Sequence, residues 1–255
     1  MIELKTDSEL AVMREAGRLV ASVLQTVRAE AKVGTSLLDL DERAADMISD
    51  AGAKSSFLHY HPSFAPSPYP AVLCTSVNSA VVHGIPTSYR LREGDLVSVD
   101  FGAAIDGWHG DAAVSFVVGA ADPADLALIE TTERGLAAGI EQLTAGNRLG
   151  DVSHAIGVIG RQAGYGLLAD HGGHGVGRAM HEDPHVPNEG KVGKGLRLRP
   201  GMVFALEPMF VAGGHDEYRH GEDGWTLYTA DGTRAAHVEH TIAVTEDGPL
   251  ILTAP

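Results

Sequence analysis

LREGDLVSVD at residues 91–100 and LRPGMVFALE at residues 198–207 are two versions of one pattern. Each begins with Leu-Arg-x-Gly and continues as an alternating apolar run, which is typical of a half-buried β-strand. Each run ends in an acid, Asp100 in the first copy and Glu207 in the second. The sequence therefore predicts a repeated strand that delivers one carboxylate in each half of the chain.

A second strand is expected in each half, and it begins with an acid. Asp111 leads AAVSFVV and Glu239 leads HTIAVT, with apolar residues at matching offsets. Acids at strand ends and Leu-Arg-x-Gly turns also occur by chance, but four acids in symmetric places favour a true repeat. Each half should therefore hold a β-ribbon whose paired strands bring two carboxylates together.

The helical segments repeat as well. Amphipathic helical patterns open near Leu10 and near Leu126. Both helices are expected to end at a glycine, Gly34 in one half and Gly146 in the other, and a shorter helix follows each glycine. Two helices and a β-ribbon in each half predict an α+β fold, with the helices outside a curved antiparallel sheet.

Length and composition limit the domain organisation and the partners. The 255 residues, 44% hydrophobic, can form one domain over 1–255, with pseudo-symmetric halves at about 1–119 and 120–255. A net charge of −15 disfavours a nucleic-acid partner, because such affinity rests on Lys and Arg. No apolar run reaches membrane-spanning length, and the first residues do not read as a secretory signal. We therefore expect a cytoplasmic protein with no membrane partner.

Four carboxylates in one cavity would repel one another unless a multivalent cation neutralised them, and a metal pair is the simplest solution. The segment GGHGVGRAMHEDP at 172–184 adds His174 and His181, of which only one need bind metal. A mixed nitrogen and oxygen site suits Mn, Fe, Co or Zn better than Ca or Mg. The sequence thus predicts a transition-metal centre.

Two other chemistries are disfavoured. The glycine run lacks the strand-before, helix-after context of a dinucleotide fingerprint, and no GxxxxGK[ST] loop occurs. A cysteine hydrolase built on Cys74 and His83 is a further candidate, but Cys74 lies in the apolar stretch AVLCTSV. Such surroundings suit a packed hydrophobic residue better than an activated thiolate.

Six motifs occur in order along essentially the whole chain: VVHGIP, VDFG, GWHGD, GGHGVGRAMHEDP, LEPM and VEHTI. Together they resemble the type I methionine aminopeptidases. The resemblance implies the pita-bread fold of creatinase and the aminopeptidases, which would explain the pseudo-two-fold repeat. It also implies a metalloprotease of protein maturation that removes the N-terminal methionine from nascent proteins and peptides, favouring a small second residue.

The resemblance further implies two divalent metal ions per chain, Co, Mn, Fe or Zn, both bridged by Asp111 and Glu239. Asp100 would complete one metal site, and His174 and Glu207 the other. The ions would acidify a water molecule and polarise the scissile carbonyl. Glu207 would accept and shuttle the proton.

The same resemblance gives the substrate-binding residues. His83 and His181 look like substrate-contacting catalytic histidines, with His181 stabilising charge on the tetrahedral intermediate and His83 assisting near the scissile bond. The methionine pocket should be apolar, with aromatic and sulfur groups. We place the rest of this pocket at Tyr60, His61, Tyr69, Cys74, Met180 and Trp225.

Two features depart from the family pattern. Met180 stands where relatives usually have an aromatic residue, and HPSFAPSPYP at 61–70 looks longer than usual, which predicts an extended loop at the pocket mouth. The other histidines are expected to be solvated or structural: His59, His109, His154, His171, His185, His215, His220, His237 and His240.

Two alternative functions stay open at this point. X-Pro aminopeptidases and dipeptidases resemble this family in fold and ligands, but they normally carry a further N-terminal domain, for which the first helix leaves no room. A metal-free peptide-binding relative would have lost a ligand, and none is missing. The expected partner is a peptide or nascent polypeptide, bound by a monomer with at most a transient ribosome contact.

Overall fold

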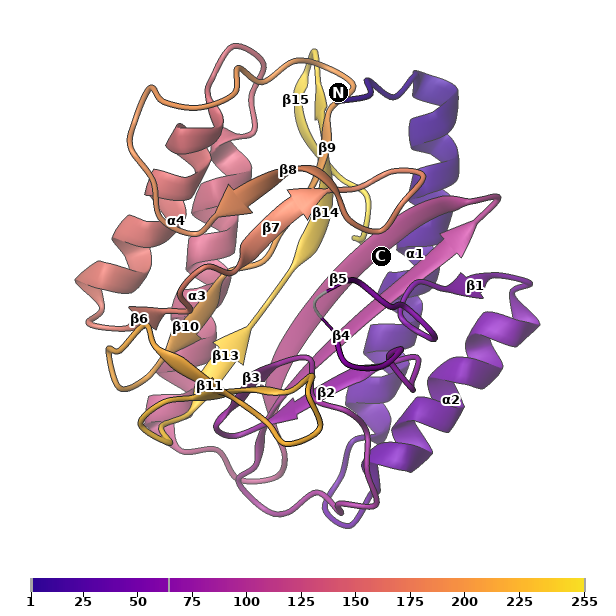
Figure 1. Cartoon of the computed structure of the whole chain (residues 1–255), viewed down its shortest axis with the longest axis vertical. Coiled ribbons are helices and arrows are strands. Elements are labelled where there is room, and N and C mark those ends of the chain that lie inside the picture. The colour runs from indigo at the N-terminus through magenta and orange to yellow at the C-terminus, as the bar shows by residue number, and fades with distance from the viewer. Residues whose placement is uncertain (1, 64, 255) are drawn as a thin grey trace.

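The computed structural model describes residues 2–63 and 65–254. Each half of the chain opens with a long helix and a shorter one (Figure 1). The shorter helices start alike, because an aspartate in the first turn of each accepts the backbone N–H of the residue before the helix. The helices are α1 (Asp7–Glu30), α2 (Leu37–Asp50), α3 (Pro123–Gln142) and α4 (Leu149–Gln162).

The strands of the first half form an antiparallel sheet in which β4 pairs with β5 on one side and with β1 and β2 on the other. The β4–β5 ribbon is the longest in the described chain. These strands are β1 (Lys54–Ser55), β2 (Cys74–Val77), β3 (Ala80–Val82), β4 (Leu96–Ile105) and β5 (Trp108–Val117).

The second half contributes a sheet with the order β15-β14-β9-β7-β8. Two small sheets, β13-β10-β6 and β11-β12-β3, lie beside it, and the second of these includes β3 from the first half. The strands are β6 (Gly166–Leu167), β7 (Gly172–Gly175), β8 (Glu182–Pro187), β9 (Val203–Leu206), β10 (Met209–Val211), β11 (Tyr218–His220), β12 (Leu227–Thr229), β13 (Ala235–His237), β14 (His240–Thr245) and β15 (Gly248–Ile251).

The two halves meet where β5 lies beside β14 (Figure 1). Ala113 and Glu239 exchange backbone hydrogen bonds of 2.9 and 3.3 Å across this seam. The Thr241 hydroxyl accepts from the backbone N–H of Asp111 at 2.9 Å and lies 2.8 Å from its carbonyl oxygen. These bonds join both ribbons into one curved surface and place Glu239 next to Asp111.

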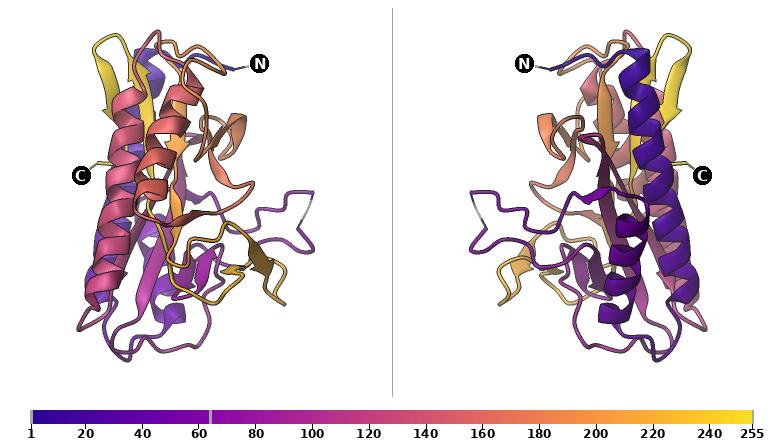
Figure 2. Two further views of the ribbon diagram at one scale, coloured as in Figure 1. Left: turned by 90° about the vertical axis from the view of Figure 1, so that its left-hand side faces the viewer. Right: turned by 90° about the vertical axis from the view of Figure 1, so that its right-hand side faces the viewer.

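The helices cover one face of this surface and leave the other to loops and small sheets (Figure 2). One apolar core lies under α1 and α2, and a second lies under α3 and α4. A third cluster, which includes Met13, Trp108, Val203 and Leu252, connects the halves. No helix among residues 2–63 and 65–254 is long and apolar enough to cross a membrane.

The predicted repeat is confirmed, but two of its boundaries were wrong. Gly34 and Gly146 donate equivalent backbone bonds to Leu91 and Leu198, at 2.7 and 3.0 Å. Both glycines have a positive φ, 91° and 98°, which explains why glycine is needed there. The long helices, however, end four residues before these glycines.

The acids of the first half do not mark strand ends, as the sequence pattern suggested. Asp100 and Asp111 lie inside β4 and β5, which continue to a tight turn at Asp106-Gly107. Both turn residues have a positive φ, 50° and 75°, as a two-residue hairpin requires. The ribbon therefore carries its two carboxylates mid-strand.

Candidate metal centre and substrate pocket

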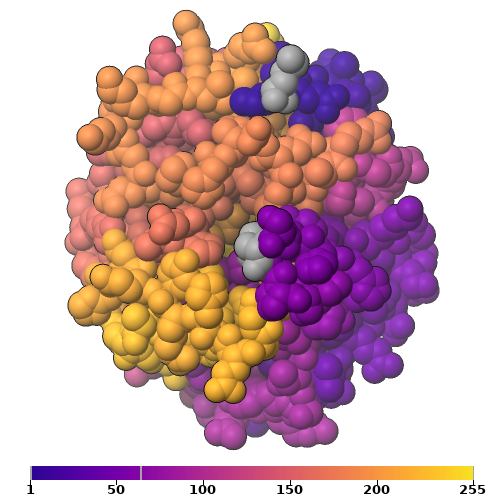
Figure 3. Space-filling model, viewed as in Figure 1, coloured from indigo at the N-terminus to yellow at the C-terminus, as the bar shows by residue number. Residues whose placement is uncertain are grey.

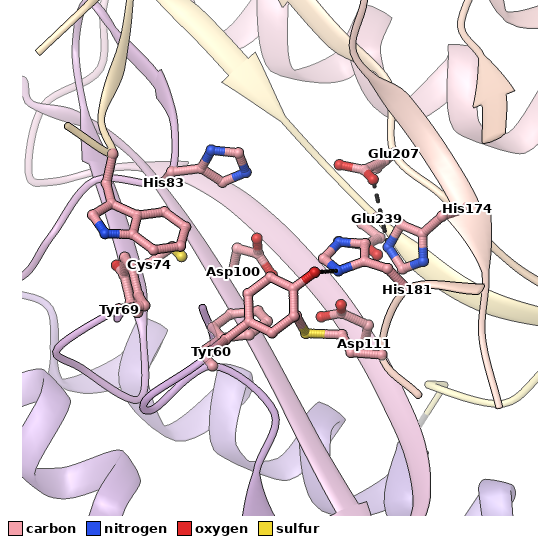
Figure 4. A pocket seen from close by; sticks show the side chains of 13 residues that line it. Tyr60, Tyr69, Cys74, His83, Asp100, Asp111, His174, His181, Glu207 and Glu239 are labelled. Carbon is pink, nitrogen blue, oxygen red and sulfur yellow. Dashed lines mark hydrogen bonds and ion pairs between the residues drawn. The ribbon is translucent and has the colours of Figure 1, made fainter. Parts of the chain in front are cut away.

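A cavity of about 270 Å³ is lined by residues from both halves of the chain. On the face shown in Figure 3, the purple loop after β1 lies beside the orange and yellow segments that include β7, β8, β11 and β12. Every predicted site residue except His61 lines the cavity, and Phe57 is an addition. An acidic end and an apolar end share this one space (Figure 4).

Neighbouring strands bring the acids together. Asp111 lies opposite Gly102 in the β4–β5 ladder, two positions from the pair that Asp100 makes with Ala113. The missing side chain at Gly102 leaves room for the Asp111 carboxylate, since a Cβ there would lie 3.1 Å from Asp111 Oδ1. Glu239 joins them through the seam.

His174 reaches the acids from β7, between β8 and β9. Its neighbour Gly173 allows β7 to approach β9, because a Cβ there would lie 2.1 Å from the Ala205 carbonyl oxygen. His174 Nδ1 donates to the Gly175 carbonyl at 2.9 Å, which leaves Nε2 with a lone pair facing the cavity. That nitrogen lies 3.7 Å from Glu207 Oε1 (Figure 4).

The acidic end has the electrostatics of a metal site. Burial, followed by mutual repulsion, raises the pKa of Asp100, Asp111 and Glu239 well above the usual carboxyl range. Burial also raises the pKa of Glu207 to about 8 and lowers the pKa of His174 to about 3. Neither change would be expected if an ordinary salt bridge neutralised the cluster.

The donor atoms fit a divalent cation. Asp100 Oδ1, Asp111 Oδ1 and Glu239 Oε1 are buried and have no hydrogen-bond partner among the described residues. Ligand atoms of Asp111, His174 and Glu239 lie within 4.8 Å of one another. Carboxylate oxygens without a hydrogen-bond partner, together with an imidazole nitrogen that has a free lone pair, are the ligand atoms that bind a borderline divalent ion.

The sequence interpretation missed His237, which was expected to be solvated or structural. Its side chain is 1% exposed, and its Nε2 lies 3.4 Å from Glu207 Oε2 and 3.9 Å from Glu239 Oε2. The signal that could have found it is its position two residues before Glu239, since residues i and i+2 of an extended segment face the same side.

The apolar end is built from aromatic and sulfur-bearing side chains. Tyr69 packs edge-on against Trp225 with ring centroids 5.1 Å apart, and its hydroxyl donates to the Leu73 and Gly84 carbonyls. Cys74 and Met180 complete the wall, each about 5% exposed. Burial raises the pKa of the Cys74 thiol well above its ordinary value, which argues against a thiolate nucleophile.

Two histidines stand between the ends. Tyr60 Oη lies 2.9 Å from His181 Nδ1 at the mouth of the cavity (Figure 4). His83 lies on the other side, edge-on to Trp225, with ring centroids 6.4 Å apart. Burial lowers the pKa of His83 to about 3, so this imidazole is neutral near pH 7.

His61 is the predicted pocket residue that the structure places elsewhere. Its Nε2 lies 3.2 Å from the Ala65 carbonyl oxygen, four residues along its own loop, and the side chain does not line the cavity. The described residues at the tip of the 61–70 loop project from the body of the molecule, whereas Tyr69 near its end is buried in the cavity wall (Figure 2). Phe64 falls outside the described residues.

Comparison with known proteins agrees with this geometry. Residues 11–246 match metallopeptidase family M24. The chain is 51% identical to methionine aminopeptidase 1 of Mycobacterium tuberculosis (strain CDC 1551 / Oshkosh), over 98% of this chain and 94% of that protein. Its structure matches the crystal structure of methionine aminopeptidase from Thermotoga maritima with a TM-score of 0.95 and 42% identity, covering 100% of both chains.

The fold and the buried acid cluster thus define a metal-dependent peptidase. The chain belongs to metallopeptidase family M24 and, within it, to the methionine aminopeptidases. It is a hydrolase that uses divalent metal and acts on peptides.

The alternative X-Pro specificity is not favoured by these comparisons. Prolidase from Pyrococcus furiosus matches with a TM-score of 0.76 and 20% identity, over 99% of this chain and 65% of that one. At this identity the match shows a shared fold alone. It confirms the predicted pita-bread architecture.

Proposed function

We propose that this site removes the N-terminal methionine from nascent proteins and peptides, and that it favours a small second residue. The observation that carries the proposal is one cavity in which an apolar pocket adjoins a cluster of buried carboxylates with oxygens that have no hydrogen-bond partner among the described residues. Cys74 and Met180 face this pocket together with aromatic rings, a surface that suits a flexible sulfur-containing side chain.

Two divalent ions per chain are proposed at the acidic end. The residues that would hold them are Asp100, Asp111, His174, Glu207 and Glu239. Such ions supply Lewis-acid activation of the scissile carbonyl and of a water molecule. The order of metal affinities does not fix the ion, so Co, Mn, Fe and Zn all stay candidates.

The side chains around the acids have separate proposed tasks. Glu207 faces the cavity next to His174, where it can accept a proton from the attacking water and pass it to the leaving amine. His181 can accept a hydrogen bond from the Tyr60 hydroxyl at Nδ1, which leaves Nε2–H free to donate to the substrate carbonyl. His83 is neutral and can act as a hydrogen-bond partner near the scissile bond without adding charge.

The whole chain is proposed to act as one catalytic domain. The ligands come from both halves, and the seam between β5 and β14 passes through Glu239 itself. Neither half would hold a complete site. We also retain the proposals of a monomer, a cytoplasmic location and at most a transient ribosome contact.

Peptide assays on the apo enzyme, with each metal added back, test the proposed specificity. Met-Ala-Ser should be cleaved, and peptides with Gly or Ser after the methionine should behave alike. A bulky second residue should crowd the acidic end and reduce cleavage, and an Ala-Pro peptide should stay intact. Efficient release of proline-linked residues, with none of methionine, would overturn the proposal.

A further inference from the structure

His237 is oriented by bonds from the opposite half of the molecule. Its backbone N–H lies 3.2 Å from Ser98 Oγ and 3.1 Å from Ser115 Oγ, and its carbonyl accepts from Ser115 Oγ at 2.7 Å. Ser98 and Ser115 belong to β4 and β5, the strands that carry Asp100 and Asp111. The ring is therefore held over the acid cluster.

The ring nitrogen at the cluster has no partner. His237 Nε2 is buried and makes no hydrogen bond within the described part of the chain, although two carboxylates lie close to it. A buried histidine with a purely structural role normally has its ring nitrogens hydrogen-bonded. The Nε2 atom is thus available to bind something that also binds the carboxylates.

The distances fit ligands of one ion. Nitrogen and oxygen ligands about 2.0–2.2 Å from a metal in tetrahedral or octahedral geometry lie roughly 3.0–3.5 Å from one another. His237 Nε2 is 3.4 Å from Glu207 Oε2, and the 3.9 Å to Glu239 Oε2 needs only a small adjustment. The three residues form a cluster with ligand atoms within 4.8 Å, which shares Glu239 with the cluster that contains His174.

We propose that His237 is a sixth protein ligand of the metal centre and binds the ion held by Glu207 and Glu239. The centre then has two imidazoles, one on each side of Glu207, whose Oε1 faces His174 and whose Oε2 faces His237. This assignment rests on the metal centre proposed above and extends it. A second nitrogen donor shifts the preference of the site towards Zn and Co and away from Mn.

Zinc K-edge X-ray absorption on the zinc-loaded, full-length protein tests the assignment without an activity measurement, because imidazole scattering reports how many histidines bind. Wild type should show two imidazoles for each pair of zinc ions. His237→Gln and His174→Ala should each show one. His185→Gln is the matched control, since His185 is an exposed histidine opposite His174 on β8 and should leave the count unchanged.

Calorimetric titration of the same proteins adds the affinities. We expect His237→Gln to weaken zinc binding at one site by at least about tenfold, and to weaken manganese binding less. His237→Asn serves as a second variant if the glutamine variant folds poorly, which circular dichroism will show. If wild type showed only one imidazole, and that imidazole were lost in His174→Ala but kept in His237→Gln, the assignment of His237 would be overturned and the proposed metal centre would stand. Failure of wild type to bind zinc would instead overturn the proposed metal centre.

Discussion

Two histidines of one motif differ in what their ring nitrogens already bind. His174 and His181 lie with ring centroids 4.2 Å apart. His174 is 7% exposed and uses Nδ1 on the Gly175 carbonyl, so its Nε2 can serve a metal. His181 is exposed at the cavity mouth and uses Nδ1 on Tyr60, so its Nε2 is left for the proposed contact with substrate. The sequence alone, which shows only their spacing, cannot display this difference.

His174→Ala should therefore lose metal as well as activity, and excess metal should restore it only in part. His181→Ala should keep its metal. Its loss should appear mainly in kcat, on the order of 10²–10³-fold, if the ring stabilises charge in the transition state. Metal analysis of both purified variants beside their kinetics distinguishes the roles. Equal metal loss in the two proteins would make His181 a ligand.

His83 predicts how the stability of the metal-free protein depends on pH. Its pKa is about 3 in the folded chain against an ordinary value of 6.5, because burial disfavours the charged ring. Between about pH 6.5 and pH 3, His83 is therefore protonated in the unfolded chain but not in the folded chain. The free energy of unfolding falls as the pH drops below about 6.5. At pH 5 the loss amounts to at most about 2 kcal/mol.

Urea unfolding at pH 7.5 and at pH 5 measures this effect. His83→Gln cannot titrate, so it should lose less stability than wild type between the two pH values. Chelator present in both buffers keeps metal binding out of the comparison. An identical pH dependence in the two proteins would show that the pKa of His83 is the same in the folded and the unfolded chain.

Among the elements, local signals predicted the helices better than the strands. The glycines before α2 and α4 repeat at one spacing, and the two helices begin at equivalent residues. The ends of β4 and β5 depend on the Asp106-Gly107 turn, a hairpin signal that the pattern of acids does not contain. The seam between β5 and β14 and the position of His237 depend on long-range pairing, which no local pattern encodes.

Strand β7 makes a testable link between packing and metal binding. Gly173→Ala would place a methyl carbon 2.1 Å from the Ala205 carbonyl oxygen and force β7 away from β9. Since His174 is the next residue, we expect weaker metal binding together with a stability loss of about 1–3 kcal/mol.

Gly17→Ala in α1 is the matched control. Its added carbon would also lie 2.1 Å from a backbone oxygen, that of Leu252, but on the helical face. Thermal melts should show both variants destabilised, whereas metal titration should show reduced affinity for Gly173→Ala alone. Normal metal affinity in both would mean that β7 can shift without moving His174.

At the scale of the whole molecule, the proposed metal centre lies on the seam between the pseudo-symmetric halves. Asp100 and Asp111 come from the first ribbon, while His174, Glu207 and Glu239 come from the second half. Apolar packing joins the halves on the helical side through the cluster around Met13 and Trp108. On the opposite side, carboxylates from the two halves lie close together and repel one another. Bound cations would attract both sets of carboxylates and so hold the halves together.

Removing metal should accordingly destabilise the entire fold. Ligand that binds only the native state stabilises it by about 4 kcal/mol at a free concentration of 1,000 times its Kd, and chelation removes this contribution. Exhaustive chelation should lower the Tm and abolish activity, and both should return on adding metal. Asp111→Asn, which removes the charge of one proposed ligand, should show a much smaller Tm shift on chelation and so assigns the shift to this site. A Tm and an activity that both stay constant through chelation would contradict the two-metal centre.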